Sequence, residues 1–280
     1  MSPIVSRLIV VGIGLLGSSI GLAAKKRGLA ETVIGIDHCQ ETLDVARRRG
    51  AVDLVLMEPD ILSEIDDGLT IVCTPVGAIV GNISRMAALN DRLLFSDVGS
   101  TKENICRELE RRKFRFIGAH PIAGSEKNGP EFGNADLFQG RLTILTPTAS
   151  SRSADVERLQ LFWESLGSQV VRMEPERHDK VLAKTSHLPH AVAAALSLLL
   201  TETERPFCGT GFTDTTRIAA GPPTIWTDIF FENRRPLLAA LEEFGHRLDA
   251  LKAALQNGDT TTIAHFLESA QKNVCTADRP

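Results

Sequence analysis

The sequence contains no tyrosine, and its other aromatic residues are few, with 12 Phe and 2 Trp among 280 residues. The absence of a phenol excludes every mechanism that uses tyrosine as general acid. Among enzymes with nicotinamide cofactors, it excludes the short-chain dehydrogenase and aldo-keto reductase types. Proton transfer in this protein must therefore depend on His, Asp, Glu, Lys or Cys side chains.

The sequence also lacks an excess of charge of one sign, clustered cysteines and long apolar segments. Basic residues number 31 and acidic residues 35, a balance that makes a poor partner for nucleic acid. The five cysteines are scattered and lack metal-type spacing, which favours a reducing cytoplasm without disulfides. The longest apolar segment, Ala191–Leu200, is interrupted by Ser197 and is shorter than the about 20 residues that cross a bilayer. We therefore expect a cytoplasmic protein with no nucleic-acid or membrane partner.

Short β-type runs alternate with helical stretches in residues 1–173. This alternation predicts a Rossmann-type α/β fold, a doubly wound parallel sheet with helices on both faces. The expected strands are Arg7–Val11, Val33–Ile36, Leu69–Cys73, Leu93–Ser96, Phe114–Ile117, Leu142–Leu145 and Gln169–Val171.

Residues 174–280 show no further β-type runs, and their apolar residues recur at three- and four-residue steps. This pattern predicts a second, all-α domain. The expected helices are Glu176–Leu200, Pro223–Asn233, Pro236–Leu255 and Thr260–Asn273. The Ala- and Leu-rich segment 191–200 suits either a subunit interface or an intramolecular core.

A glycine motif, Gly12-Ile13-Gly14-Leu15-Leu16-Gly17, follows the first expected strand and opens a helix. Its first glycine permits a tight turn, the second lets the backbone approach a pyrophosphate, and the third allows close helix–strand packing. Asp37 ends the second strand, where a carboxylate accepts hydrogen bonds from ribose hydroxyls and repels a 2′-phosphate. The pattern predicts a dinucleotide site that prefers NAD to NADP; the alternative is a strand–helix turn that binds no ligand.

The segment Cys73-Thr74-Pro75-Val76 ends the strand nearest the expected switch point of the sheet. Ligands of such sheets lie outside the carboxyl ends of the strands. We therefore assign Thr74 and Pro75 to the nicotinamide half of the cofactor, with a plain strand-terminating turn as the alternative.

Polar side chains gather in four further segments, at expected strand ends and helix breaks. Each segment also has a purely structural interpretation: Ser100 can cap a helix, His120 can belong to a turn, and Arg217 can be a surface residue. His187 and His190 share a helix face, but two histidines without a third ligand are weak evidence for zinc, so we expect no metal. The segments are Ser96–Lys102, Gly118–Lys127, Thr185–His190 and Gly209–Arg217.

Taken together, these motifs resemble those of the prephenate/arogenate dehydrogenase family, which acts in tyrosine biosynthesis. The resemblance runs in order through both expected domains. The matching segments are Gly12–Gly17, Asp97–Lys102, Gly118–Glu126, Ser186–His190 and Gly211–Arg217. It implies a Rossmann domain followed by a helical domain that binds substrate and forms a homodimer.

The resemblance also implies a reaction, the NAD-dependent oxidative decarboxylation of prephenate to 4-hydroxyphenylpyruvate. His120 would accept the ring hydroxyl proton, and Ser100 would hold that hydroxyl and His120 in register. Arg217 offers a planar fork for a substrate carboxylate. The remaining expected substrate-binding residues are His187, His190, Ser125 and Glu126.

Three other functions remain open. Glu126 can pair with an ammonium group, which keeps arogenate or dual cyclohexadienyl activity possible. A β-hydroxyacid dehydrogenase would use a lysine of the helical domain, such as Lys180 or Lys184, although neither has the expected sequence context. A non-enzymatic NAD-responsive protein would have no need of a proton acceptor such as His120.

Overall fold

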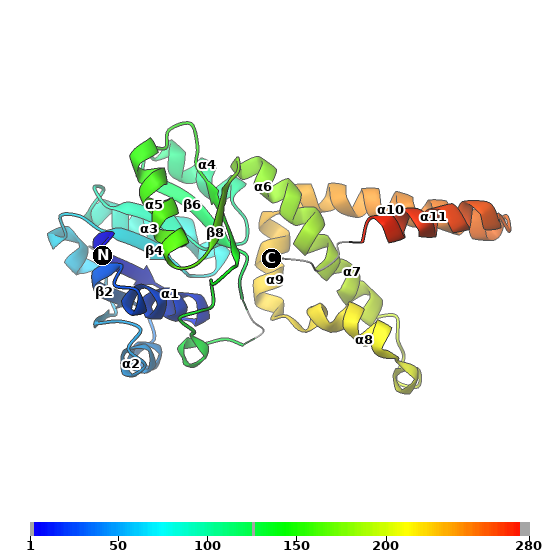
Figure 1. The fold of residues 1–280 in the computed structure, drawn as a ribbon, viewed down its shortest axis with the longest axis horizontal. Helices are drawn as coiled ribbons and strands as arrows, with labels where there is room; N and C mark the ends of the chain where they lie inside the picture. The colour runs from blue at the N-terminus through cyan, green and yellow to red at the C-terminus, as the bar shows by residue number, and fades with distance from the viewer. Residues whose placement is uncertain (1–2, 125–126, 275–280) are drawn as a thin grey trace.

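The computed structural model describes residues 3–124 and 127–274, which form an α/β domain followed by a helical domain (Figure 1). One eight-stranded sheet has the order β3-β2-β1-β4-β5-β6-β7-β8. Its strands are β1 Val5–Val11, β2 Ala30–Ile36, β3 Leu54–Leu56, β4 Leu69–Val72, β5 Leu94–Asp97, β6 Phe116–Pro121, β7 Leu142–Thr146 and β8 Gln169–Arg172. The order reverses beside β1, which places the switch point between β1 and β4.

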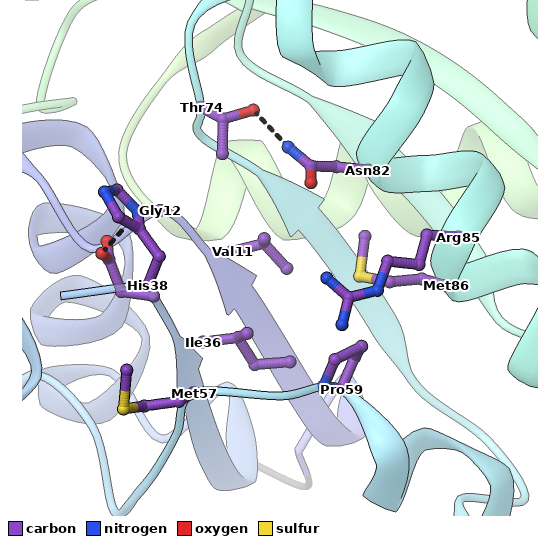
Figure 2. A pocket seen from close by; sticks show the side chains of 11 residues that line it. Val11, Gly12, Ile36, His38, Met57, Pro59, Thr74, Asn82, Arg85 and Met86 are labelled. Atoms are coloured by element: carbon purple, nitrogen blue, oxygen red, sulfur yellow. Dashed lines mark hydrogen bonds and ion pairs between the residues drawn. The ribbon is translucent and has the colours of Figure 1, made fainter. Parts of the chain in front are cut away.

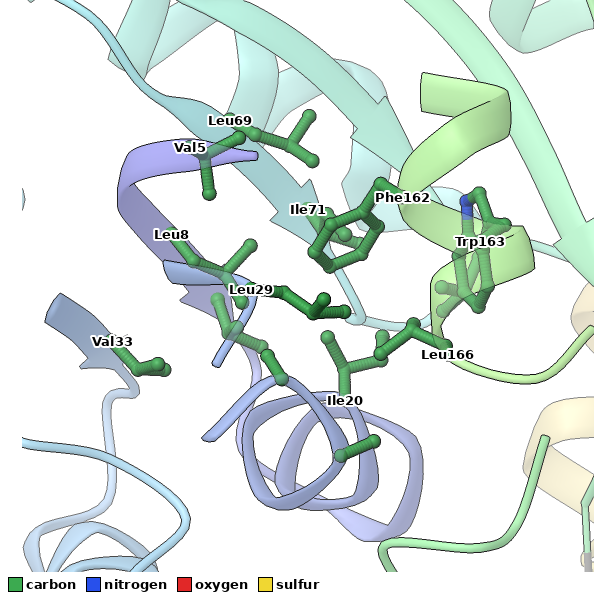
Figure 3. Packing of buried hydrophobic residues seen from close by; sticks show 14 of the residues in the cluster. Val5, Leu8, Ile20, Leu29, Val33, Leu69, Ile71, Phe162, Trp163 and Leu166 are labelled. Atoms are coloured by element: carbon green, nitrogen blue, oxygen red, sulfur yellow. The ribbon is translucent and has the colours of Figure 1, made fainter. Parts of the chain in front are cut away.

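Helices cover both faces of the sheet. Alternate residues of β1 point to opposite sides, so Leu8 and Val10 join one apolar core while Ile9 and Val11 join the other. On the first face, Ile20 of α1 and the Phe162–Trp163 pair of α5 pack over the sheet (Figure 3). The helices of this domain are α1 Leu15–Lys26, α2 Gln40–Arg48, α3 Val76–Leu89, α4 Glu103–Arg111 and α5 Ser153–Ser165.

The sheet is mostly parallel, as predicted, and its last part contains one antiparallel pair. β7 runs antiparallel to β6, with His120 opposite Ile144, and β8 then runs parallel to β7. The connection from β6 to β7 contains one short helix among its described residues, Pro130–Phe132, and that helix packs on α1 and α2. A parallel pair requires a crossover that covers one face of the sheet, and this connection returns the chain without one.

The seven predicted strands are present, with ends shifted by a few residues, and the structure adds β3. This edge strand has three residues and pairs with β2 at Ile34–Leu54. A strand of that length contains too little alternation for the sequence to reveal it.

The second domain is helical, as predicted. α6 and α7 continue one another through a single turn of π-helix, Ala183–His187, so that Pro189 lies in the first turn of α7. Proline cannot donate a backbone hydrogen bond, and the wider π turn absorbs this loss without breaking the helix. The helices are α6 Pro175–Leu182, α7 Leu188–Ser197, α8 Thr210–Thr216, α9 Pro223–Glu232, α10 Arg234–Gln256 and α11 Thr260–Lys272.

Two arms of the helical domain project away from the sheet, one formed by α10 and α11 and the other by α7 and α8 (Figure 1). Large apolar side chains are exposed on these arms, among them Leu198 at 85% and Leu199 at 74% of full exposure just after α7. Leu238, Leu248 and Leu255 of α10 are likewise exposed. Within the part of the chain that the structure describes, no helix is both long and apolar enough to cross a membrane.

Candidate active site

The glycine motif forms the turn between β1 and α1 at the switch point of the sheet. Gly12 has φ +86°, and a Cβ atom there would lie 3.0 Å from the Cys73 carbonyl carbon, so β1 and the β4 loop approach closely only with glycine. A Cβ at Gly17 would collide with the Gly12 carbonyl oxygen. A Cβ at Gly14 would meet nothing described within 4 Å, so the backbone of the loop is open there to a ligand.

Asp37 follows β2 and is hydrogen-bonded to the backbone of this loop. One carboxylate oxygen accepts the Ile13 N–H at 2.9 Å, and the other accepts the Cys39 N–H at 3.0 Å. Asp37 also lines a pocket at the carboxyl ends of β1 and β2, together with His38, Asn82 and Arg85 (Figure 2). Asn82 and Arg85 enter this pocket from α3 on its far side.

Thr74 and Pro75 lie between β4 and α3, beside the glycine loop. The Asn82 side-chain amide donates to the Thr74 hydroxyl at 3.1 Å, and Pro75 immediately precedes the first residue of α3. Both residues thus stand at the same edge of the sheet as Gly12, at the switch point where the sequence placed them.

A buried ion pair follows β5. Lys102 Nζ contacts the Asp97 carboxylate, and both side chains are fully buried. Asp97 also accepts the backbone N–H groups of Gly99 at 2.9 Å and Ala119 at 3.1 Å. The pair therefore ties the loop after β5 to β6, and Ser100 lies half-buried on that loop.

His120 lies near the carboxyl end of β6, which extends beyond its pairing with β5 toward the helical domain. Its Nδ1 is hydrogen-bonded to His178 Nε2 of α6 at 2.9 Å. Burial lowers the pKa of His120 well below its usual range, and the neighbouring His178 and Lys102 lower it further. Among the described residues Ser100 makes no hydrogen bond to His120, so the observed partner of that ring is His178.

Asp179 connects the histidine pair to the α/β domain. One of its carboxylate oxygens accepts His178 Nδ1 at 2.8 Å and the Lys102 N–H at 2.8 Å. The other oxygen accepts the Glu103 N–H at 2.9 Å. The carboxylate thus satisfies two donors at the N-terminus of α4, whose helix dipole favours negative charge there.

His187 and His190 gather around Trp226 of α9. The His190 ring stacks on the indole with 3.5 Å between centroids, whereas His187 meets it edge-on at 6.3 Å. Asn233 donates its side-chain amide to His187 Nδ1 at 2.8 Å and to the Asp179 carbonyl at 2.9 Å. Burial lowers the pKa of His187 to about 4, so this ring is neutral at physiological pH.

The other sequence candidates do not join this cluster by any described contact. Arg217 is exposed at the start of a short 3₁₀ helix, Arg217–Ala220, and its side chain makes no hydrogen bond or ion pair with a described residue. Ser125 and Glu126 lie outside the described residues. Over residues 3–124 and 127–274, no three His, Cys, Asp or Glu side chains are grouped so as to hold a metal ion.

The lysine candidates for a β-hydroxyacid dehydrogenase mechanism point to solvent. Lys180 pairs with Glu176 at 2.7 Å on the exposed side of α6. Lys184 pairs with Glu243 of α10, and both of these side chains are more than half exposed. Neither lysine contacts the histidine cluster, which removes the residues on which that alternative depended.

The sequence did not indicate a role for His178, Asp179 or Asn233. His178 and Asp179 lie inside the predicted helix 176–200, where adjacent polar residues have the pattern of an exposed face. One signal was available in the sequence. A histidine and an acid, His178 and Asp179, stand next to each other shortly before the Ser186–His190 motif. Asn233 had no such signal, because its role depends on contacts 46 and 54 residues away in the chain.

We expect the free energy of unfolding to fall as the pH is lowered from about 6.5 toward 4. Burial holds the His187 pKa near 4, so in that interval the unfolded chain binds a proton that the folded chain does not. The loss for His187 reaches about 3 kcal/mol at pH 4 and vanishes above pH 6.5, where the ring is neutral in both states. Denaturant titrations of the wild type and His187→Gln measure this, and equal pH dependence in both proteins would contradict it.

The chain joins an α/β sheet that carries a glycine loop to a helical domain that packs on α3 and α4. This is the architecture of two-domain dehydrogenases. (S)-3-hydroxybutyryl-CoA dehydrogenase from Ralstonia eutropha, at 13% identity and a TM-score of 0.52, shares this fold alone. The nucleotide-binding domain of prephenate dehydrogenase matches residues 20–172, and its dimerization domain matches residues 174–269. The chain therefore belongs to the prephenate dehydrogenase family.

The relatives of this chain are named for different substrates. A cyclohexadienyl dehydrogenase from Zymomonas mobilis is 35% identical over 93% of this chain and 92% of its own length. A prephenate dehydrogenase from Bacillus subtilis is 30% identical over 97% of this chain and 76% of its own length.

Two solved structures have the same overall arrangement. The prephenate dehydrogenase from A. aeolicus in complex with hydroxyphenyl propionate and NAD+ has a TM-score of 0.90 and 30% identity, covering 95% of this chain and 96% of that one. The arogenate dehydrogenase from Synechocystis has a TM-score of 0.84 and 27% identity, covering 95% and 98%.

Proposed function

We propose that this protein oxidises prephenate with NAD and releases the ring carboxylate as carbon dioxide, giving 4-hydroxyphenylpyruvate. The observation that carries the proposal is His120, a neutral imidazole at the carboxyl end of β6 that faces the helical domain. A neutral ring can accept a proton, and burial of the site excludes competing water. The A. aeolicus relative with NAD+ and a hydroxyphenyl acid supports the same chemistry.

We assign separate roles in the reaction to residues of the α/β domain. His120 takes the proton of the ring hydroxyl while a hydride leaves the same carbon, and the proton returns when loss of carbon dioxide yields the phenol. Ser100 lies on the loop after β5 and is proposed to contact the hydroxyl. When bound, NAD supplies the hydride acceptor. Gly12–Gly17, with Asp37, Thr74 and Pro75, would hold it at the switch point.

The helical domain would bind the remainder of the substrate. His187 has its Nδ1 occupied by the Asn233 amide, so in the neutral ring Nε2 carries the hydrogen and can donate to a substrate oxygen. His190 and the stacked Trp226 offer a flat surface beside it. Arg217 is proposed to bind a substrate carboxylate, and Ser125 and Glu126 are proposed to contact the substrate.

Arogenate is the second candidate substrate, because relatives named cyclohexadienyl dehydrogenase and arogenate dehydrogenase are also similar to this chain. Assaying prephenate and arogenate, each with NAD and with NADP, separates these possibilities through the absorbance of reduced nicotinamide. We expect prephenate to be oxidised with a higher kcat/KM with NAD than with NADP, because the Asp37 carboxylate repels a 2′-phosphate. Absence of turnover with both substrates would refute the proposed function. A preference for NADP would show that Asp37 does not contact the ribose of the cofactor.

We also propose that the protein is a homodimer joined through the helical domain. The dimerization-domain match and the exposed leucines of the two arms support this assembly. Light scattering coupled to gel filtration should give the mass of two chains of 30.4 kDa each. Leu248→Lys on α10 should shift the protein toward the monomer, and a monomeric wild type would contradict the proposal.

A further inference from the structure

We propose that His178 and Asp179 are positioning residues that fix the tautomer of His120, so that Nε2 of His120 presents a lone pair to the substrate hydroxyl. The inference rests on the proposed role of His120 as proton acceptor. It names two residues that would contact neither substrate nor cofactor and would act through the histidine.

Asp179 is buried, with 2% of its surface exposed. Both of its carboxylate oxygens accept backbone N–H groups at the start of α4, from Lys102 at 2.8 Å and from Glu103 at 2.9 Å. These amides can only donate, so they require acceptor oxygens. The third partner, His178 Nδ1 at 2.8 Å, must therefore carry the hydrogen and donate it to the carboxylate.

This hydrogen bond determines the protonation of the His178 ring. Burial lowers the pKa of His178, so the ring is neutral and holds one hydrogen, which is on Nδ1. Its Nε2 is then an acceptor. The atom 2.9 Å away, Nδ1 of His120, must supply the hydrogen of the bond that joins the two rings.

His120 is in consequence the Nδ1–H tautomer, whose unprotonated nitrogen is Nε2. Only this tautomer can accept the hydroxyl proton through Nε2, because the other would present a hydrogen there. When Nε2 receives the proton, the bond to His178 becomes charge-assisted, and the Asp179 carboxylate opposes the new positive charge. The Lys102 ammonium also disfavours positive charge on His120, a cost that the Asp179 carboxylate would offset.

Through the same hydrogen bonds, the orientation of the His120 ring depends on how the helical domain packs against the α/β domain. Asp179 and His178 lie on α6, whereas Lys102, Glu103 and His120 belong to the α/β domain. Asn233, between α9 and α10, holds the Asp179 carbonyl through its side-chain amide at 2.9 Å. The orientation of the proton acceptor thus results from contacts between the two domains.

Nitrogen-15 NMR of histidine tautomers in the full-length protein with NAD tests the proposal. The His120 signals are assigned by their loss in His120→Asn. We expect the Nδ1–H tautomer in the wild type and a mixture in His178→Phe, which keeps a ring but removes the acceptor. kcat of His178→Phe should fall about 10–100-fold, while the Kd for NAD is unchanged. In His178→Gln a carbonyl oxygen can replace Nε2, so this variant should retain more kcat than His178→Phe.

The matched control is His265→Phe, since His265 is exposed on α11. An Nε2–H tautomer of His120 in the wild type would overturn the proposal, as would an unchanged tautomer and kcat in His178→Phe. Should that variant fail to fold, His178→Gln and the wild-type spectrum decide the question. The tautomer is measured without turnover, so an enzyme inactive on both substrates would refute the proposed function and leave this test standing.

Discussion

His120→Asn should lower kcat by about 10²–10⁴, the usual cost of losing a general base. Asparagine is close to histidine in size and polarity, but its amide cannot take up a proton at neutral pH. His120 is 9% exposed, so bulk water cannot easily replace the missing acceptor. Steady-state kinetics with prephenate and NAD measure the effect.

The cofactor should bind to His120→Asn with an unchanged Kd, because the glycine loop belongs to β1 and α1, away from β6 in the sheet. His265→Asn provides a control for the loss of a histidine at an exposed position. Unchanged kcat in His120→Asn would remove His120 from the proposed role. A large loss in His265→Asn would show that the assay does not isolate the site.

Lys102→Met should destabilise the fold by about 3–5 kcal/mol. The Lys102 side chain is fully buried, and its ammonium is paired with the equally buried Asp97. The glycines at 99 and 118 leave room for it, since a Cβ at Gly118 would lie 3.0 Å from Lys102 Cδ. Methionine fills that space but leaves the Asp97 charge, among the described residues, with the backbone N–H donors of Gly99 and Ala119.

The double variant Asp97→Asn/Lys102→Met should recover much of this loss, because it buries no net charge. Lys180→Met is the matched control, since Lys180 forms an exposed pair with Glu176 and should change stability by less than about 1 kcal/mol. Denaturant unfolding monitored by tryptophan fluorescence measures all three. A Lys102→Met protein as stable as Lys180→Met would show that the buried pair contributes nothing to stability.

Local patterns predicted much of the α/β domain. The motif Gly12–Gly17 and the acid Asp37 require only a strand, a turn and a helix in succession, and each residue acts within that unit. The alternation of β-type and helical runs likewise reports each element separately. The family was recognisable because five motifs occur in a specific order along the chain.

The tertiary structure decided what depends on contacts distant in sequence. The antiparallel return of β7 depends on where the β6–β7 connection packs, and the three-residue β3 exists through pairing with β2. The partner of His120 is 58 residues away, and the amides that Asp179 accepts are 76 and 77 residues away. The sequence by itself placed a histidine, His120, at the end of a strand of the α/β domain. Only the docking of α6 against α4 and β6 determined which nitrogen of that histidine is hydrogen-bonded to His178, and a tautomer is set by such a partner.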